Sequence, residues 1–293
     1  MKKLLFTFLV ICFSLSLKAQ QETLLSQYRS QMSLFNPAVA GVNDASKLTM
    51  LHRRQWANVA MSPITTSLTY GLNAGKNVGL GFSIISDKVF IEQSTFVSVD
   101  YSYRLQLDDI SFLYLGIKAG GNFYALNTAN LNTFNVVADP SINSISFFMP
   151  NIGFGAYYTR GDFYFSLSVP RVLNTERTKT ENGRVTTATD RPHLYTSFGV
   201  DFLISKESNV TLQPSILSRL VAGAPNTIDA NIMVNFDSRL SLGATYRNND
   251  SYAGILQMPI TKEIRVGLAY ETARGNEITV AGNSFEMLLS YQF

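Results

Sequence analysis

The sequence predicts an all-β protein: a transmembrane antiparallel up-and-down β-barrel of about 14 strands, preceded by a signal peptide. Three observations support this fold class. The final segment, 284–293, alternates large apolar residues with polar ones and ends on the aromatic Phe293. Roughly fourteen segments of this kind follow one another from residue 47 onward. Every second connection between them is short, as in outer-membrane barrels.

The first 19 residues have the composition of a secretory signal peptide. Lys2 and Lys3 precede an apolar run over 4–17, and Ala19 supplies the small residue expected at a cleavage site. The apolar run is shorter than the ~20 residues that a membrane-spanning helix needs. We therefore divide the chain into a signal peptide (1–19), an N-terminal periplasmic or plug segment (20–46) and an outer-membrane barrel (47–293).

Composition excludes several other classes of function. The formal net charge of +3 is small and scattered, so neither nucleic-acid binding nor a polybasic membrane arm is expected. The only cysteine, Cys12, lies inside the predicted signal peptide and follows Ile11, where a lipidation site would need a small residue. The mature chain is therefore expected to have no disulfide, cysteine–zinc site or cysteine nucleophile.

The predicted strands are about 8–12 residues long, close to the ~9–11 residues of a tilted membrane strand. Charged residues within them, such as Asp100, Arg247 and Glu271, fall on the face opposite the aromatic residues. That segregation predicts an apolar face toward lipid and a polar face toward the lumen. The segments are 47–56, 64–72, 77–86, 94–105, 110–122, 150–160, 162–170, 193–204, 209–219, 226–236, 239–247, 251–259, 263–271 and 284–293.

The connections distinguish a barrel from a soluble sandwich, which could show the same alternation. With the chain end on the periplasmic side, every second connection should be a short periplasmic turn. Long connections, 123–149, 171–192 and 272–283, fall at the other end. The predicted short turns are 73–76, 106–109, 161, 206–208, 237–238 and 260–262.

Two strands contain residues that fit a barrel poorly. Pro214 cannot donate a ladder hydrogen bond, which predicts a bulge or a position near the rim. Arg53 and Arg54 are adjacent, so one of them must point outward. An outward arginine costs roughly 2–4 kcal/mol at the bilayer midplane but about 0–1 near the headgroups. We therefore expect both arginines and Trp56 at the outer rim.

A barrel of about 14 strands is too wide for the side chains of its wall to fill the lumen, so water, a segment of the chain or a partner must occupy it. About eight strands fill their own interior, whereas 16–18 leave an aqueous channel. The candidates for filling are segment 20–46 and the loops 123–149 and 171–192. Tyr28, Leu34 and Phe35 make the N-terminal segment too apolar for a solvated tail. We expect it to pack into the periplasmic mouth or to dock a periplasmic partner.

Two further sites have alternative interpretations. Asn36, Pro37, Ala38 and Gly41 form either a turn into the first strand or a functional latch, and turn chemistry favours the former. The apolar stretch 145–150, with Phe147 and Phe148, is expected on an outer loop. There it would either fold into the lumen or receive a partner, because exposed apolar patches usually mark contacts.

Catalysis is not expected. A nucleophile–base pair needs a serine near an oriented histidine, and the only histidines are His52 and His193. No nucleophile-elbow, metal-ligand or phosphate-loop motif is present. We therefore predict no enzyme activity, no cofactor and no metal.

The region 25–72 resembles one family. It reads L-S-Q-Y-R-S-Q-M-S-L-F-N-P-A-V-A-G, then L-H-R-R-Q-W, then S-P-I-T-T-S-L. This order of motifs resembles the PorP/SprF family of outer-membrane proteins from Bacteroidota. The motifs cover about fifty residues. The rest of the chain resembles the family only in its length, its number of strands and its aromatic C-terminal residue. Residues 58–61 differ from the sequence at that place in the family, which is often rich in glycine. The motif residues, taken with Phe147 and Phe148 as candidate partner contacts, are Gln27, Tyr28, Asn36, Pro37, Ala38, Gly41, Arg53, Arg54, Gln55, Trp56 and Pro63.

The resemblance implies a role in the type IX secretion system and in gliding motility. It implies a non-enzymatic barrel that supports secretion or surface anchoring of a large adhesin by recognising the adhesin's C-terminal region. The implied partners are that adhesin, periplasmic secretion or gliding machinery, and outer-membrane lipid. The alternative that the residues leave open is a passive or ligand-specific channel for small solutes, with an outer-membrane hydrolase a distant third.

Overall fold

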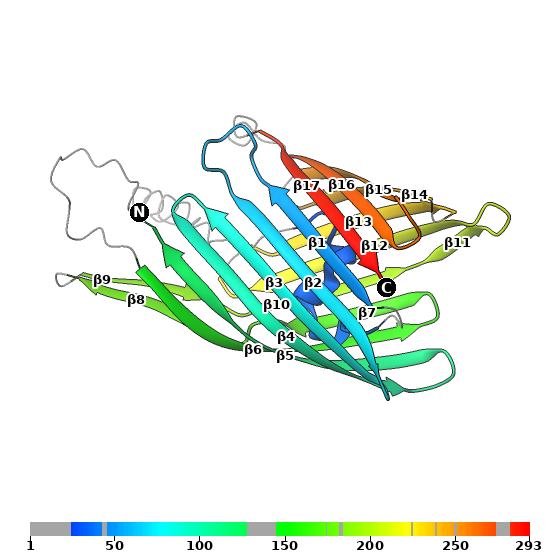
Figure 1. The fold of residues 1–293 in the computed structure, drawn as a ribbon, viewed down its shortest axis with the longest axis horizontal. Coiled ribbons are helices and arrows are strands. Elements are labelled where there is room, and N and C mark those ends of the chain that lie inside the picture. The colour runs from blue at the N-terminus through cyan, green and yellow to red at the C-terminus, as the bar shows by residue number, and fades with distance from the viewer. Residues whose placement is uncertain are drawn as a thin grey trace, which may run out of the picture.

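The chain forms a closed antiparallel barrel in a computed structural model (Figure 1). The structure describes residues 25–42, 46–127, 145–173, 175–181, 184–223, 225–237, 239–248, 251–273 and 282–293. The predicted signal peptide and most of the long connection after residue 126 lie outside these ranges. Among the residues described, no helix is long and apolar enough to cross a membrane.

Seventeen strands are described, and the fourteen positions that they fill in the barrel wall follow the predicted segments in order. They are β1 (Lys47–Arg54), β2 (Ile64–Gly75), β3 (Val78–Val89), β4 (Glu92–Gln106), β5 (Ser111–Leu126), β6 (Ile145–Arg160), β7 (Phe163–Val169), β8 (Thr175–Glu181), β9 (Arg184–Asp190), β10 (His193–Val200), β11 (Phe202–Ser205), β12 (Val210–Val221), β13 (Thr227–Phe236), β14 (Leu240–Arg247), β15 (Ser251–Pro259), β16 (Ile264–Ala273) and β17 (Ser284–Gln292).

Pairing β1 with β17 closes the barrel, and β8 and β9 form a separate hairpin. β10 and β11 together occupy one position beside β12, so the barrel has 14 strands, as predicted. The break between them lies at Asp201, near Pro214 of β12. Because proline has no N–H, the ladder is interrupted there, in agreement with the irregularity expected from the sequence.

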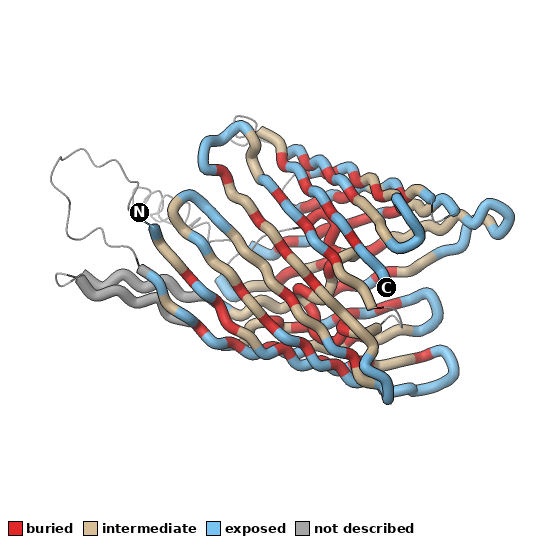
Figure 2. The backbone as a smooth tube through the Cα atoms, in the orientation of Figure 1, coloured by how far each residue is buried: buried red, intermediate tan, exposed pale blue. Residues whose placement is uncertain are grey.

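Burial alternates from residue to residue along most strands of the wall (Figure 2). Large apolar residues such as Val99, Leu268 and Phe285 point outward and stay exposed, whereas Ser98, Asp100 and Glu286 point inward and are buried. Outward aromatic rings contact one another across strands, for example Tyr270 and Phe285 with centroids 5.1 Å apart. The outside is therefore suited to lipid and the lumen is polar, as the alternation predicts.

The two ends of the barrel differ. The terminal end, where β1 begins and β17 ends, carries the short turns, and the opposite loop end carries the longer connections. The hairpin β8–β9 projects from the loop end (Figure 1).

One expectation at the loop end is wrong. Residues 145–150 belong to β6 rather than to a loop, because β6 stays paired with β5 as far as Ile145, toward the loop end.

Candidate functional site in the barrel lumen

Residues 25–42 form a plug inside the barrel (dark blue in Figure 1). The plug contains the 3₁₀-helix η1 (Tyr28–Gln31), the α-helix α2 (Met32–Phe35) and the 3₁₀-helix η2 (Pro37–Val39). Tyr28 and Ala38 have no exposed surface, and Leu25 is 1% exposed. The apolar residues that would be costly in a solvated tail are thus covered by the barrel wall.

The stretch Asn36–Ala38 is a capped turn. The Asn36 side chain accepts a hydrogen bond from the Ala38 N–H at 2.9 Å, and Pro37 occupies the first position of η2. The same side chain donates to the Ala156 carbonyl of β6 at 2.9 Å and to the Ser166 hydroxyl of β7 at 2.8 Å. The turn interpretation is therefore correct for the local backbone, and the Asn36 amide also joins that turn to the wall.

Glycines in the wall make room for this turn. A Cβ at Gly116 of β5 would clash with the backbone of Pro37 and Ala38, and one at Gly155 of β6 would clash with Asn36. The plug backbone therefore touches the strand backbone directly. Past the turn, Gly41 adopts φ +69°, a left-handed conformation that glycine adopts without strain.

The other end of the plug is held by charge. The Glu286 carboxylate of β17 accepts hydrogen bonds from the backbone N–H groups of Ser26 at 2.7 Å and Gln27 at 3.1 Å. Arg53 of β1 contacts the same carboxylate at 2.6 Å and Glu271 of β16 at 2.9 Å. These side chains are nearly inaccessible to solvent, with Arg53 2% and Glu286 1% exposed.

The charged network continues along the wall. Arg247 of β14 contacts Glu271 at 3.0 Å and Asp229 of β13 at 2.6 Å. Glu271 also accepts a hydrogen bond from the Ser26 hydroxyl at 3.0 Å. Each buried charge thus has an opposite charge beside it, which is the arrangement that offsets the cost of desolvation.

Both arginines lie at the loop end of β1, as its last two residues, and Arg53 is the one that does not point outward. Strand alternation turns it inward, and the buried carboxylates of β16 and β17 hold it there. Arg54 is the outward, exposed member of the pair. Gln55 and Trp56 follow in the β1–β2 connection, where the Gln55 N–H donates to the Pro63 carbonyl at 2.9 Å.

Tyr28 fixes the middle of the plug. Its hydroxyl donates to the Ser215 hydroxyl of β12 at 2.8 Å. Burial raises the pKa of the Tyr28 phenol, so it remains a neutral donor at physiological pH. The next residue, Arg29, pairs with Asp201 at 3.0 Å, at the break in the wall opposite Pro214.

A second charged pair supports α2. Lys118 of β5 contacts Asp100 of β4 at 2.9 Å, and its ammonium also donates to the Ser33 carbonyl at 3.1 Å. Both side chains are almost fully buried. The lysine thus links the wall to the Ser33 carbonyl of the plug helix.

The aromatic residues singled out in the sequence are divided between the two faces. Phe148 points outward, 54% exposed, with its ring 4.8 Å from that of Phe123. Phe147 points inward against Tyr124, with centroids 5.0 Å apart. Neither folds back as a loop plug.

No catalytic arrangement is found in the part of the chain that the structure describes. His52 is exposed, with Nδ1 3.0 Å from the Thr66 hydroxyl, and the His193 ring stacks near Tyr195. The described residues contain no group of three or more histidine, cysteine, aspartate or glutamate side chains placed to hold a metal ion. Sequence reasoning missed Glu286, Glu271 and Lys118 as plug contacts; their only signal was a charge at an inward position.

Comparison with known proteins identifies the family. Residues 17–291 match the family described as type IX secretion system membrane protein PorP/SprF. The chain belongs to the PorP/SprF family. A search of curated proteins found no match. The family and the fold place the protein in the outer membrane, with its terminal end toward the periplasm because short turns lie on that side.

Two solved outer-membrane barrels share the fold at low sequence identity. The outer membrane protein Omp33 of Acinetobacter baumannii is 12% identical, with a TM-score of 0.50, covering 86% of this chain and 100% of its own. The CymD monoaromatic hydrocarbon channel is 10% identical, with a TM-score of 0.52 and 92% of each chain covered. At these identities the likeness concerns the fold alone.

Proposed function

We propose that this protein is a non-enzymatic barrel that supports secretion or surface anchoring of a large secreted adhesin. It would recognise the adhesin's C-terminal region at the loop end, through the long connections and the upper lumen. The single observation that carries the proposal is the plug. A family barrel whose lumen holds its own segment 25–42 offers a fixed scaffold rather than a wide pore.

The shape of the loop end supports the proposal. The hairpin β8–β9 is built from seven-residue strands in continuous register and projects away from the wall. A paired hairpin presents backbone groups on its edges, which another extended chain can engage by adding a strand. The short turns at the terminal end offer no comparable surface among the residues described.

Co-purification tests the proposal. The tagged protein would be purified from outer membranes in detergent and its co-eluting chains identified, with and without the hairpin 175–190. We expect a secreted protein with a type IX C-terminal domain to co-elute with the intact chain and to be lost with the hairpin. A variant with residues 206–208 replaced by Gly-Ser-Gly serves as the matched control at the terminal end.

Two results would contradict the proposal. One is the absence of any secreted protein from the intact preparation in cells that express the secretion system. The other is an undiminished yield of that protein from the hairpin deletion. A heated and unheated gel comparison of both variants would establish that the barrel itself still folds.

A further inference from the structure

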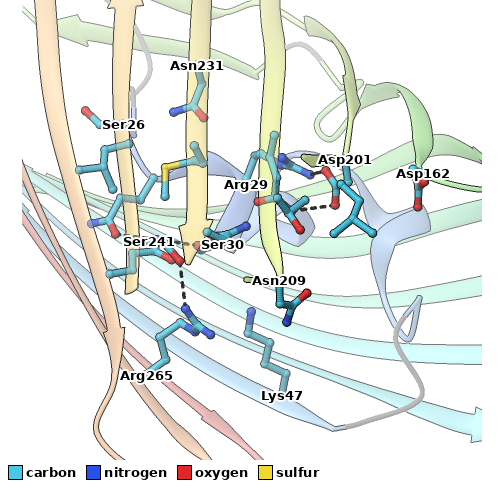
Figure 3. Close-up of a pocket in the computed structure, with 18 residues that line it drawn as sticks. Ser26, Arg29, Ser30, Lys47, Asp162, Asp201, Asn209, Asn231, Ser241 and Arg265 are labelled. Carbon is cyan, nitrogen blue, oxygen red and sulfur yellow. Dashed lines mark hydrogen bonds and ion pairs between the residues drawn. The ribbon is translucent and has the colours of Figure 1, made fainter. Parts of the chain in front are cut away.

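A polar cavity lies beside the plug at the terminal end. Its volume is about 660 Å³, within the range of small-molecule sites, and it lies between the plug and the wall formed by β11 to β16 (Figure 3). Residues near the ends of strands, such as Lys47, Asn209 and Arg265, line its mouth. The cavity is therefore approached from the periplasmic side of the barrel.

Two cations at this mouth have no carboxylate partner among the residues that the structure describes. Lys47 of β1 and Arg265 of β16 flank the end of β17, opposite Gln292 and Ser290 of that strand, and both line the cavity. The Arg265 guanidinium donates to the Ser241 hydroxyl at 3.3 Å, and neither residue forms an ion pair with any described residue. The two carboxylates that line the cavity, Asp162 and Asp201, lie on the opposite wall (Figure 3), and Asp201 is paired with Arg29.

This contrasts with three buried cations elsewhere in the lumen. Arg53, Arg247 and Lys118 each have a carboxylate within 3.0 Å. Bringing two like charges together without a counter-charge is unfavourable, so an anion bound between them is stabilised.

Carboxamide side chains form much of the remaining surface. Gln213, Gln257 and Asn235 line the cavity and can both donate and accept hydrogen bonds. Gln27 and Asn231, 3% and 6% exposed, also line it, and each has one buried polar atom without a partner among the described residues. Those two atoms are shielded from the cavity space, so Gln213, Gln257 and Asn235 are the carboxamides that would hydrogen-bond a ligand there.

We propose that this cavity binds a carboxylate-bearing ligand from the periplasm. Lys47 and Arg265 hold the carboxylate at the mouth, and the carboxamides hydrogen-bond the polar part that extends inward. Two sources carry this chemistry: the C-terminus of a polypeptide and a free small dicarboxylate. The proposal does not rest on adhesin recognition, because the cavity is at the other end of the barrel.

Calorimetric titration of the purified full-length protein in neutral detergent at low salt tests it. The probes are acetylated tetra-alanine with a free C-terminal carboxylate, the same peptide as its C-terminal amide, and succinate. We expect at least one carboxylate probe to bind. If the natural ligand is the C-terminus of a polypeptide, the peptide amide should bind at least tenfold more weakly than the peptide acid. Tighter binding of succinate than of the peptide acid would identify a free dicarboxylate.

Variants separate the two cations from general charge effects. The double variant Lys47→Gln/Arg265→Gln should weaken carboxylate binding at least tenfold, and Lys47→Arg/Arg265→Lys should largely retain it. The matched control, Lys76→Gln/Lys262→Gln, removes two exposed turn charges at the same end and should leave binding unchanged. Failure of both carboxylates to bind the intact protein, or equal binding by the Gln double variant, would overturn the proposal.

Discussion

The two ends of the plug are attached to the wall by different physical means. The turn Asn36–Gly41 contacts β5 and β6 through uncharged groups, at positions where Gly116 and Gly155 have no side chain. The stretch Ser26–Gln31 contacts the wall through buried charges centred on Glu286 and Arg53. The first attachment depends on shape and the second on electrostatics, so different substitutions should disrupt each.

The difference also concerns what happens when one partner is lost. A buried ion pair contributes little net stability, but removing one partner leaves an uncompensated charge in a dry site. A glycine contact fails in another way, since an added side chain must displace the backbone opposite it. We expect the charged attachment to be the more sensitive of the two.

The largest effect is expected for Arg53→Met. The change leaves Glu286 without its cation, and breaking a buried pair of this kind costs about 3–5 kcal/mol. The free energy of unfolding would be measured by urea titration of the protein in lipid vesicles. Arg54→Met, on the outward face of the same strand, is the control and should change stability by about 0.5 kcal/mol or less. Equal effects of the two substitutions would contradict the inward network.

A smaller effect is expected for Gly116→Val. The new side chain clashes with Pro37 and Ala38, and overpacking of this kind costs typically about 1–3 kcal/mol. Because the predicted mature chain has no cysteine, an Ala38→Cys reporter can follow the plug by maleimide labelling. Labelling should be slow in the parent and fast with Gly116→Val.

Gly254→Val is the control for the glycine substitution. A Cβ at Gly254 meets nothing within 4 Å, so the plug should stay protected. If the reporter reacts at the same rate in all three backgrounds, the turn is not held by close contact with β5.

A change of about 1 kcal/mol is expected for Tyr28→Phe. It removes the hydrogen bond to Ser215 and leaves that hydroxyl unpaired within the lumen. Tyr101→Phe, on the outward face, removes a hydroxyl of the same kind from an exposed position and should leave stability unchanged. Urea midpoints of the two variants provide the comparison, and equal midpoints would argue that Tyr28 contributes only apolar contact.

The smallest effect is expected for Arg29→Gln. Its pair with Asp201 is partly exposed, with side chains 21% and 36% accessible, so we expect a loss of about 0.2–1 kcal/mol. High salt should reduce this loss, whereas the loss from Arg53→Met should be nearly independent of salt. Measuring both in low and high salt would show whether the two charged contacts differ as their burial implies.

Much of this organisation could be predicted from the sequence. Period-two alternation and the regular succession of short and long connections predict the barrel and its number of strands, because both patterns follow from local backbone geometry. The turn at Asn36–Pro37 was also predictable, since its chemistry is local.

The plug contacts could not be predicted in the same way. Arg53, Glu271 and Glu286 lie on three adjacent strands but are far apart in sequence. Their pairing depends on barrel closure through β1 and β17 and on strand register, neither of which is visible in a single strand. The extension of β6 to Ile145 was missed because its apolar run resembled a loop contact rather than paired strand residues.

Ion conductance in planar bilayers tests the central claim most directly. The account predicts that the intact protein conducts poorly because residues 25–42 fill the lumen, and that deletion of 25–41 opens a steady pore through the same barrel. A large steady conductance from the intact protein, left unchanged by the deletion, would contradict it.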